Sequence, residues 1–182
     1  MRLAKDTERI HAAGAEVMAI SVNELERQVG MRSRWRLDDQ LLVSDPGGET
    51  YLQSLGLFDP EERGGIALPG LLVITPDGSE AYRYEGRDFA DRTTDDEMYA
   101  ALEGLGLPVV DTPAGAPDGE APEDLRGFFT PEMYGPYFRG NMFASIAIGR
   151  RIGADSEAKA TAKEHQAMAA ATVEAWDEVR KR

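Results

Sequence analysis

Short apolar runs separated by turn residues dominate the first hundred positions of the chain. Residues 16–22 and 40–44 are runs of Val, Met, Ile and Leu that suit buried parallel strands better than alternating surface strands. Residues 71–75 (LLVIT) give the clearest strand pattern, and a Pro-Asp-Gly turn leads from them into 81–84. The sequence therefore predicts two buried strands followed by an antiparallel hairpin.

Helical spacing and capping signals occupy the intervals between these strands. Apolar positions recur on one helix face, Gly14 stands where a helix C-terminal glycine belongs, and Ser/Thr-x-x-Glu capping boxes occur twice. We expect helices over 2–13, from the Ser21–Glu24 capping box to Trp35, over 50–55, and from the Thr94–Glu97 capping box to Leu105.

The last third of the chain changes in composition. Residues 108–124 are rich in Pro, Gly, Ala and acid, which gains too little from burial to offset conformational entropy, so they predict a linker. Beyond it, an aromatic-rich stretch leads into an Ala-rich one with apolar residues at helical steps. We therefore divide the chain into a domain at 1–107, a linker at 108–124 and a helical extension at 125–182.

Composition removes several classes of function. The 182 residues contain no cysteine, which excludes disulfides, thiolate nucleophiles, Cys-ligated zinc and iron–sulfur clusters. The net charge of −13 disfavours nucleic acid and anionic lipid surfaces as partners. The N-terminal residues lack the apolar run of a signal peptide and no stretch is long enough to span a bilayer, so we expect a cytoplasmic protein.

Three segments, AGAEVMAISVN, LLVSDPGGE and ALPGLLVITPDG with YEGRDFADRTTDDE, resemble the alkyl hydroperoxide reductase and thiol-specific antioxidant family, the peroxiredoxin-like proteins. The resemblance covers roughly residues 1–107. It implies an α/β fold, a thioredoxin-like three-layer sandwich, truncated before its first core helix and followed by the C-terminal helical extension. It further implies a cis bond at Leu68-Pro69 and identifies Arg92 with an arginine found in many members.

The chain departs from this family at two points. The family's peroxidatic cysteine, at the start of the first core helix, has no counterpart, and Pro69-Gly70 stands where an arginine would steady the thiolate. The resemblance thus implies an antioxidant redox protein that is inactive as written. Because the family's central strand is also absent, we expect the strands at 16–22 and 71–75 to pair directly in parallel.

Candidate functional residues are few, and each can also be explained by an ordinary structural role. Asp95, Asp96 and Glu97 suit a helix N-terminus better than a Ca²⁺ or Mg²⁺ site, and His165 has no nucleophile beside it. The Leu68-Pro69 backbone could pair with an extended partner or simply be inherited with the fold. The aromatic residues of the extension, among them Tyr134, Tyr137, Phe138 and Phe143, could line a ligand pocket, bind a partner, or pack within the chain or a homodimer.

We predict no catalytic residue, cofactor or metal. Two functions remain open: a peroxiredoxin-like redox protein that lacks its cysteine, and a non-catalytic thioredoxin-like module. The second function would use the C-terminal helices to form a homodimer or to bind a protein partner.

Overall fold

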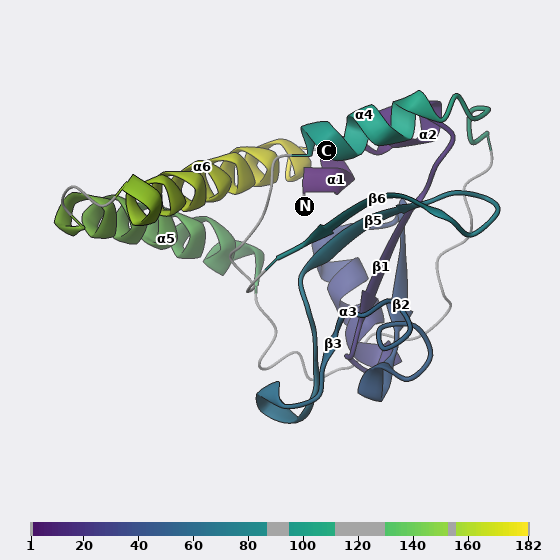
Figure 1. Cartoon of the computed structure of the whole chain (residues 1–182), viewed down its shortest axis with the longest axis horizontal. Helices are drawn as coiled ribbons and strands as arrows, with labels where there is room; N and C mark the ends of the chain where they lie inside the picture. Colours follow the sequence, from purple (N-terminus) through teal and green to yellow (C-terminus); the bar gives the residue numbers. More distant parts are fainter. Residues whose placement is uncertain (1, 87–94, 112–129, 153–155, 182) are drawn as a thin grey trace.

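The computed structural model describes residues 2–86, 95–111, 130–152 and 156–181, and it combines helices with small sheets (Figure 1). The helices are α1 (Arg2–Lys5), α2 (Thr7–Ala12), α3 (Leu25–Trp35), α4 (Asp96–Gly104), α5 (Pro131–Arg151) and α6 (Ser156–Val179). The strands are β1 (Val17–Ser21), β2 (Gln40–Ser44), β3 (Phe58–Asp59), β4 (Ile66–Ala67), β5 (Gly70–Ile74) and β6 (Glu80–Glu85). The mixed α/β class expected from the sequence is confirmed.

Three two-stranded sheets form within the described residues. β1 and β2 pair in parallel, with Val17 opposite Gln40 and Ser21 opposite Ser44. β5 and β6 pair antiparallel, while β3 and β4 make a short antiparallel ladder. The strands predicted at 16–22 and 40–44 and the hairpin predicted from 71 to 84 are therefore confirmed, because their apolar runs and the Pro-Asp-Gly turn specify them locally.

The predicted parallel pairing between 16–22 and 71–75 is wrong. β1 pairs only with β2 and β5 only with β6 among the described strands. β4 lies next to β1 instead, and the Leu57 side chain packs so closely on Gly70 that a Cβ there would lie 2.7 Å from Leu57 Cδ1. Val17 of β1 packs on the buried group that contains Val73 of β5, but the two strands form no ladder.

The predicted cis bond at Leu68-Pro69 is also wrong, since the peptide is trans. The segment runs extended from β4 into β5. Leu68 N–H donates to the Leu57 carbonyl at 2.9 Å, and the Pro69 carbonyl accepts from Gly86 N–H at 2.7 Å. An extended backbone paired on both sides needs only the ordinary trans isomer.

The helix predicted over 2–13 divides in two at Asp6, whose φ of −104° and ψ of 18° interrupt α1 and α2. Asp6 accepts a hydrogen bond at 2.8 Å from the hydroxyl of Tyr99 in α4, and Thr7 Oγ1 donates to the Ala4 carbonyl. A tertiary contact with α4 therefore accompanies the break, and the local sequence pattern carries no sign of it.

Two further local predictions fail at the residue level. α3 ends at Trp35 as expected, but the Ser21–Glu24 capping box does not form: Glu24 is the N-cap without a side-chain bond, and Ser21 accepts from Asn23 N–H instead. The helix predicted over 50–55 is a series of turns. The carboxylate of Asp45 accepts hydrogen bonds from backbone N–H groups of that segment, and these bonds replace helical ones.

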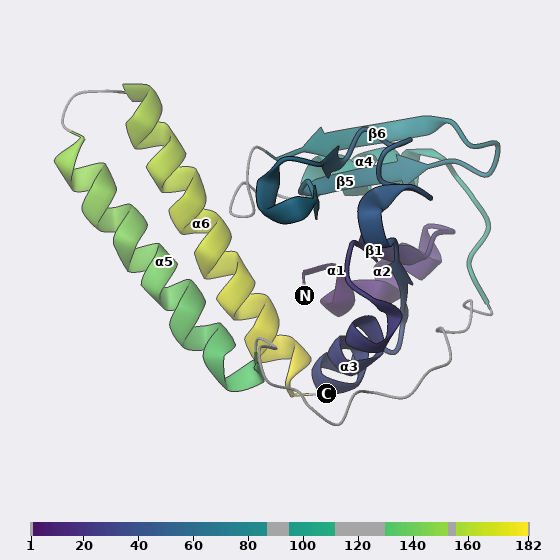
Figure 2. The ribbon, with the colours of Figure 1, turned by 90° about the horizontal axis from the view of Figure 1, so that it is seen from below.

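The helices predicted in the second half of the chain are confirmed as α4, α5 and α6. Thr94 of the second capping box and most of the predicted linker, 112–124, lie outside the described residues. None of the described helices combines the length and the apolar character needed to cross a membrane. α5 and α6 form an antiparallel hairpin that reaches well past the strands (Figure 2).

Two separate groups of buried side chains hold the described elements together. The first joins α1, α3 and β2 to the helical hairpin and comprises Ala4, Trp35, Leu37, Leu42, Tyr134, Trp176 and Val179. The second joins α2, α4 and β5 and comprises Ile10, Val73, Met98, Tyr99 and Leu102. The hairpin is thus attached to the body at one end only, through the first group.

Candidate interaction surface

Two of the aromatic residues singled out in the sequence attach the hairpin to the body. Tyr134 is 9% exposed, and its ring centroid lies 5.1 Å from that of Trp35 and 5.5 Å from that of Trp176. Phe138, partly buried, packs on Tyr134 at 4.7 Å. Trp35 and Trp176 also meet edge to face at 4.9 Å. Such packing stabilises the contact between α3 and the hairpin beyond simple area burial.

The other two lie open on α5. Tyr137 is 41% exposed and Phe143 is 63% exposed. Met133 and Ile148 on the same helix are 51% and 53% exposed. An amphipathic surface helix normally turns a polar face to water, whereas α5 exposes large apolar side chains. We call Met133, Tyr137 and Ile148, which share one side of the helix, the open face of α5, whereas Phe143 lies on another side.

Charge is nearly absent from the middle of α5. Between Glu132 and Arg150, the sequence MYGPYFRGNMFASIAIG contains Arg139 as its single charged residue. Met133 and Ile148 were missed in the sequence analysis, although this uncharged stretch marks them. A helix that lacks charge along its length is typically covered by other protein.

A groove of about 650 Å³ runs between α5 and α6 beyond the aromatic cluster. Its lining is mostly small or weakly polar: Asn141, Ala144, Ser145, Ile148 and Ile152 from α5, and Glu157, Ala158, Thr161, Ala162 and His165 from α6. The two helices are close here, because a Cβ on Gly149 would lie 3.4 Å from that of Ala162, within van der Waals contact. The groove has the size of a ligand pocket but is open, like a helix-binding surface.

Of the remaining predicted positions, only His165 among the described residues takes part in this surface. Leu68 and Pro69 lie between β4 and β5 with the backbone bonds described above, and Arg92 lies outside the described residues. His165 lines the groove, and Asp96 and Glu97 are in the first turn of α4. Within the described ranges, no three His, Asp or Glu side chains gather as metal ligands would.

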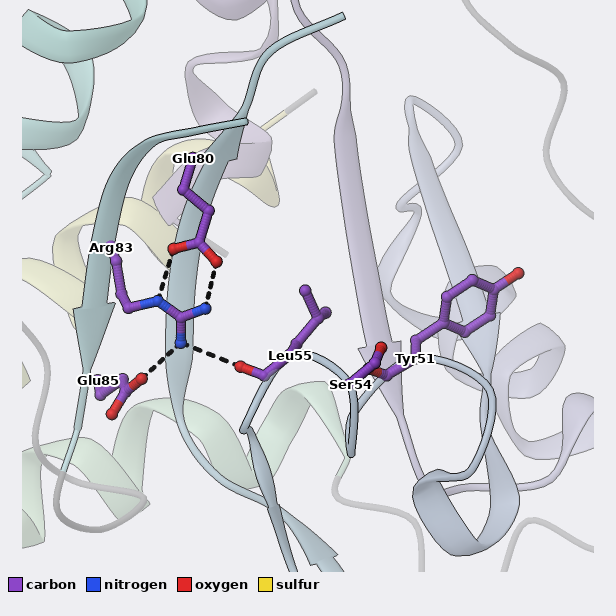
Figure 3. Close-up of polar contacts among 6 residues, drawn as sticks. All are labelled: Tyr51, Ser54, Leu55, Glu80, Arg83 and Glu85. Atoms are coloured by element: carbon purple, nitrogen blue, oxygen red, sulfur yellow. Dashed lines mark hydrogen bonds and ion pairs between the residues drawn. The ribbon is translucent and has the colours of Figure 1, made fainter. Parts of the chain in front are cut away.

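A cluster of polar contacts surrounds Arg83 of β6 (Figure 3). Its guanidinium pairs with Glu80 and Glu85 and donates to the Leu55 carbonyl at 3.0 Å. The hydrogen bonds with Glu80 and then Glu85 raise the pKa of Arg83, so it remains a cation. The cluster connects β6 to the turn after β2. A guanidinium whose N–H groups are bonded in this way has a structural role rather than a catalytic one.

Comparison with known protein families, curated proteins and solved structures found nothing that matches this chain.

Proposed function

We propose that this chain is a non-catalytic protein-interaction module in which α5 is the docking helix. The observation that carries the proposal is the open face of α5, which presents large apolar side chains from a helix with one charge in its central seventeen residues. Exposed apolar patches mark sites of contact with protein, membrane or ligand. Their exposure in an isolated chain would otherwise favour aggregation.

The chemistry of the remaining side chains supports a binding role over a catalytic one. The sequence contains no cysteine, so thiol-based peroxide reduction has no nucleophile. Its two histidines are far apart along the chain, one in α2 and one in the groove. These side chains therefore suit a chain that presents a helix for binding rather than one that positions reacting groups.

A thioredoxin-like, peroxiredoxin-related body is our second proposal for the first 107 residues. The order of elements supports it: a parallel pair, β1 and β2, comes before an antiparallel hairpin, β5 and β6, which is followed by α4. The trans bond before Pro69 removes one of its supports. In this reading the body descends from a redox fold and serves as a scaffold for α5 and α6.

Site-specific photo-crosslinking of the full chain in cells tests the interaction proposal. A photoreactive amino acid is placed at Met133 or Ile148 on the open face, and at Ala170, an exposed position on the outer side of α6, as the matched control. Adducts with a protein at the α5 positions and none at position 170 are expected. Equal labelling at all three positions, or none at any, would refute the proposal.

A further inference from the structure

We propose that the partner of α5 is a second copy of this chain, whose own α5–α6 hairpin packs into the interhelical groove to complete a four-helix bundle. This inference rests on the proposed function, because it names the partner for the same surface. The bundle would be a twofold-symmetric dimer, in which each copy offers the same groove and the same open side chains.

Only the inner end of the α5–α6 hairpin is packed against other described elements. Its inner end is packed by Trp35, Tyr134 and Trp176, with α1 also against α6. Its outer half extends past the body in both views, and no other described element covers the groove there (Figures 1 and 2). Two helices alone bury too little apolar surface to hold each other, whereas four helices enclose a core.

The open face and the groove lie on one side of the hairpin. Met133, Tyr137, Ala144 and Ile148 are separated by steps of four, seven and four residues, so they form one stripe along α5. Ala144 and Ile148 also line the groove. Phe143 is about 140° around the helix from Ile148 at 3.6 residues per turn, so it lies away from this stripe.

Met133, Tyr137 and Ile148 are each roughly half exposed, and side chains of this size bury up to about 200 Å² each, so they offer roughly 300 Å². A specific, stable interface buries about 600–1,000 Å² from each partner. The rest of the dimer contact would come from the groove lining and the residues that flank it.

Charge along α5 suits pairing with a second copy. Arg150 and Arg151 at the outer end of α5 are exposed cations, and Arg139 lies near its middle, so this helix offers a basic partner no acidic surface between Glu132 and Arg150. In an antiparallel pairing, the Arg150–Arg151 end of one α5 meets the exposed Glu132 end of the other. This arrangement gives opposite charges at both ends of the contact.

The net charge of −13 on each chain opposes association but need not prevent it. The contact would form on the part of α5 between Glu132 and Arg150, which contains no acidic residue. At physiological salt, repulsion between exposed charges is screened beyond about 8 Å. The pairs between Glu132 and the Arg150–Arg151 end are exposed and contribute little, so relief of the net repulsion dominates and dimer formation should strengthen as salt is raised.

Sedimentation equilibrium of the purified full chain provides the test. We expect a concentration-dependent mass that approaches twice the 19.9 kDa of one chain and a lower dimer Kd in about 0.5 M than in about 0.05 M salt. Ile148→Glu places a charge in the stripe and should raise the dimer Kd at least tenfold. Ala170→Glu adds the same charge on the outer side of α6 and should leave the Kd unchanged.

Phe143→Glu separates the proposed geometry from a general apolar contact, because it should weaken the dimer less than Ile148→Glu does. Circular dichroism and thermal melting of each variant confirm that the fold is retained. A wild-type chain that stays monomeric up to about 100 µM, well above the ~10 µM range of weak specific complexes, overturns the inference. So does equal weakening by Ile148→Glu and Ala170→Glu.

The photo-crosslinking experiment distinguishes this failure from failure of the proposed function. Adducts from position 148 with a different protein, together with a monomeric purified chain, overturn the second-copy inference and leave the interaction module standing. Absence of any α5-specific adduct overturns both the second-copy inference and the interaction-module proposal. Ile148-dependent sedimentation of the purified chain with phosphatidylcholine vesicles, without self-association, would replace the dimer by a lipid surface and overturn the inference.

Discussion

The carboxylate of Asp45 organises the turn that follows β2. Its side chain is 1% exposed and accepts hydrogen bonds from the backbone N–H groups of Thr50, Tyr51 and Leu52 at 3.0, 2.9 and 2.9 Å. Burial acts to raise the pKa of Asp45, but the backbone bonds from Leu52, Thr50 and Tyr51 together outweigh it, and the pKa lies below its ordinary value. The ionised form is therefore the one that the fold prefers.

We predict that Asp45→Asn lowers the Tm by roughly 5 °C near neutral pH. Both carboxylate oxygens of Asp45 accept backbone hydrogen bonds, whereas the side-chain NH₂ group of an asparagine cannot accept one. A pKa lowered by folding stabilises the native state above the unfolded pKa, near 4, and this contribution disappears as pH falls through the folded value. The difference in Tm between wild type and variant should consequently shrink below about pH 4. Thermal melts across pH measure it.

Asp39→Asn, at an exposed aspartate a few residues away, is the control for the loss of one negative charge. It should change the Tm little at any pH. A gap between wild type and Asp45→Asn that is the same at pH 3 and pH 7, outside the ~1 °C error of such melts, contradicts the assigned role of the ionised carboxylate.

At the scale of elements, strands and helix positions were predictable wherever the signal is local. The apolar runs of β1, β2 and β5 and the periodic face of α4 each specify their own conformation. The break at Asp6 and the turn over 50–55 were not, because hydrogen bonds from Tyr99 and to Asp45 come from outside those segments. Local signals cannot report such partners.

The candidate surface was predictable only in part for a related reason. Tyr134, Tyr137, Phe138 and Phe143 looked alike in the sequence, yet the first packs in the core and the last is open. Which face of α5 is covered depends on where Trp35 and Trp176 stand. Periodicity gives the relative phase of residues on a helix but not the direction of its neighbour.

The contact between the end of α2 and residues 107–110 depends on Gly14. Its φ is +81°, and a Cβ there would lie 2.5 Å from Leu107 Cβ and 2.6 Å from the Pro108 carbonyl oxygen. Val110 N–H donates to the His11 carbonyl at 3.0 Å in the same contact. A side chain at Gly14 must therefore push this returning segment away from α2.

We predict that Gly14→Ala destabilises the fold by about 1–3 kcal/mol more than Gly78→Ala, as measured by urea unfolding. Gly78 has a similar φ of +87° with nothing within 4 Å of its Cβ position. The two variants share the cost of a left-handed alanine, about 1–2 kcal/mol, so their difference isolates the close approach. Equal losses would show that residues 107–110 do not pack on α2 in solution.

For the molecule as a whole, the missing cysteine decides the redox question. We predict that the purified chain does not turn over hydrogen peroxide with a thiol reductant, because sulfenic acid formation requires a thiolate. The seven methionines can be oxidised, but only stoichiometrically without a reductase. Peroxide consumption is followed with and without dithiothreitol, and sustained turnover above the protein-free rate contradicts the prediction.

The division of the buried side chains into two groups gives the whole molecule two units of stability. Trp35, 6% exposed, belongs to the group that holds the hairpin, and Leu102, 3% exposed, belongs to the group around α4 and β5. The two groups share no buried residue, although Leu3 of α1 and Val17 of β1, the strand paired with β2, pack on the second group. Groups that share no buried residue can open in separate steps.

We therefore predict reciprocal losses of amide protection in hydrogen exchange. Trp35→Ala, which should cost about 3–5 kcal/mol, exposes amides of α3, α5 and α6 more than those of α4 and β5, and Leu102→Ala, at about 2–5 kcal/mol, does the reverse. Trp35→Phe and Leu102→Val provide milder versions if either alanine variant fails to fold. Loss of protection spread evenly over all described helices in both variants would mean that one cooperative core, not two, stabilises the chain.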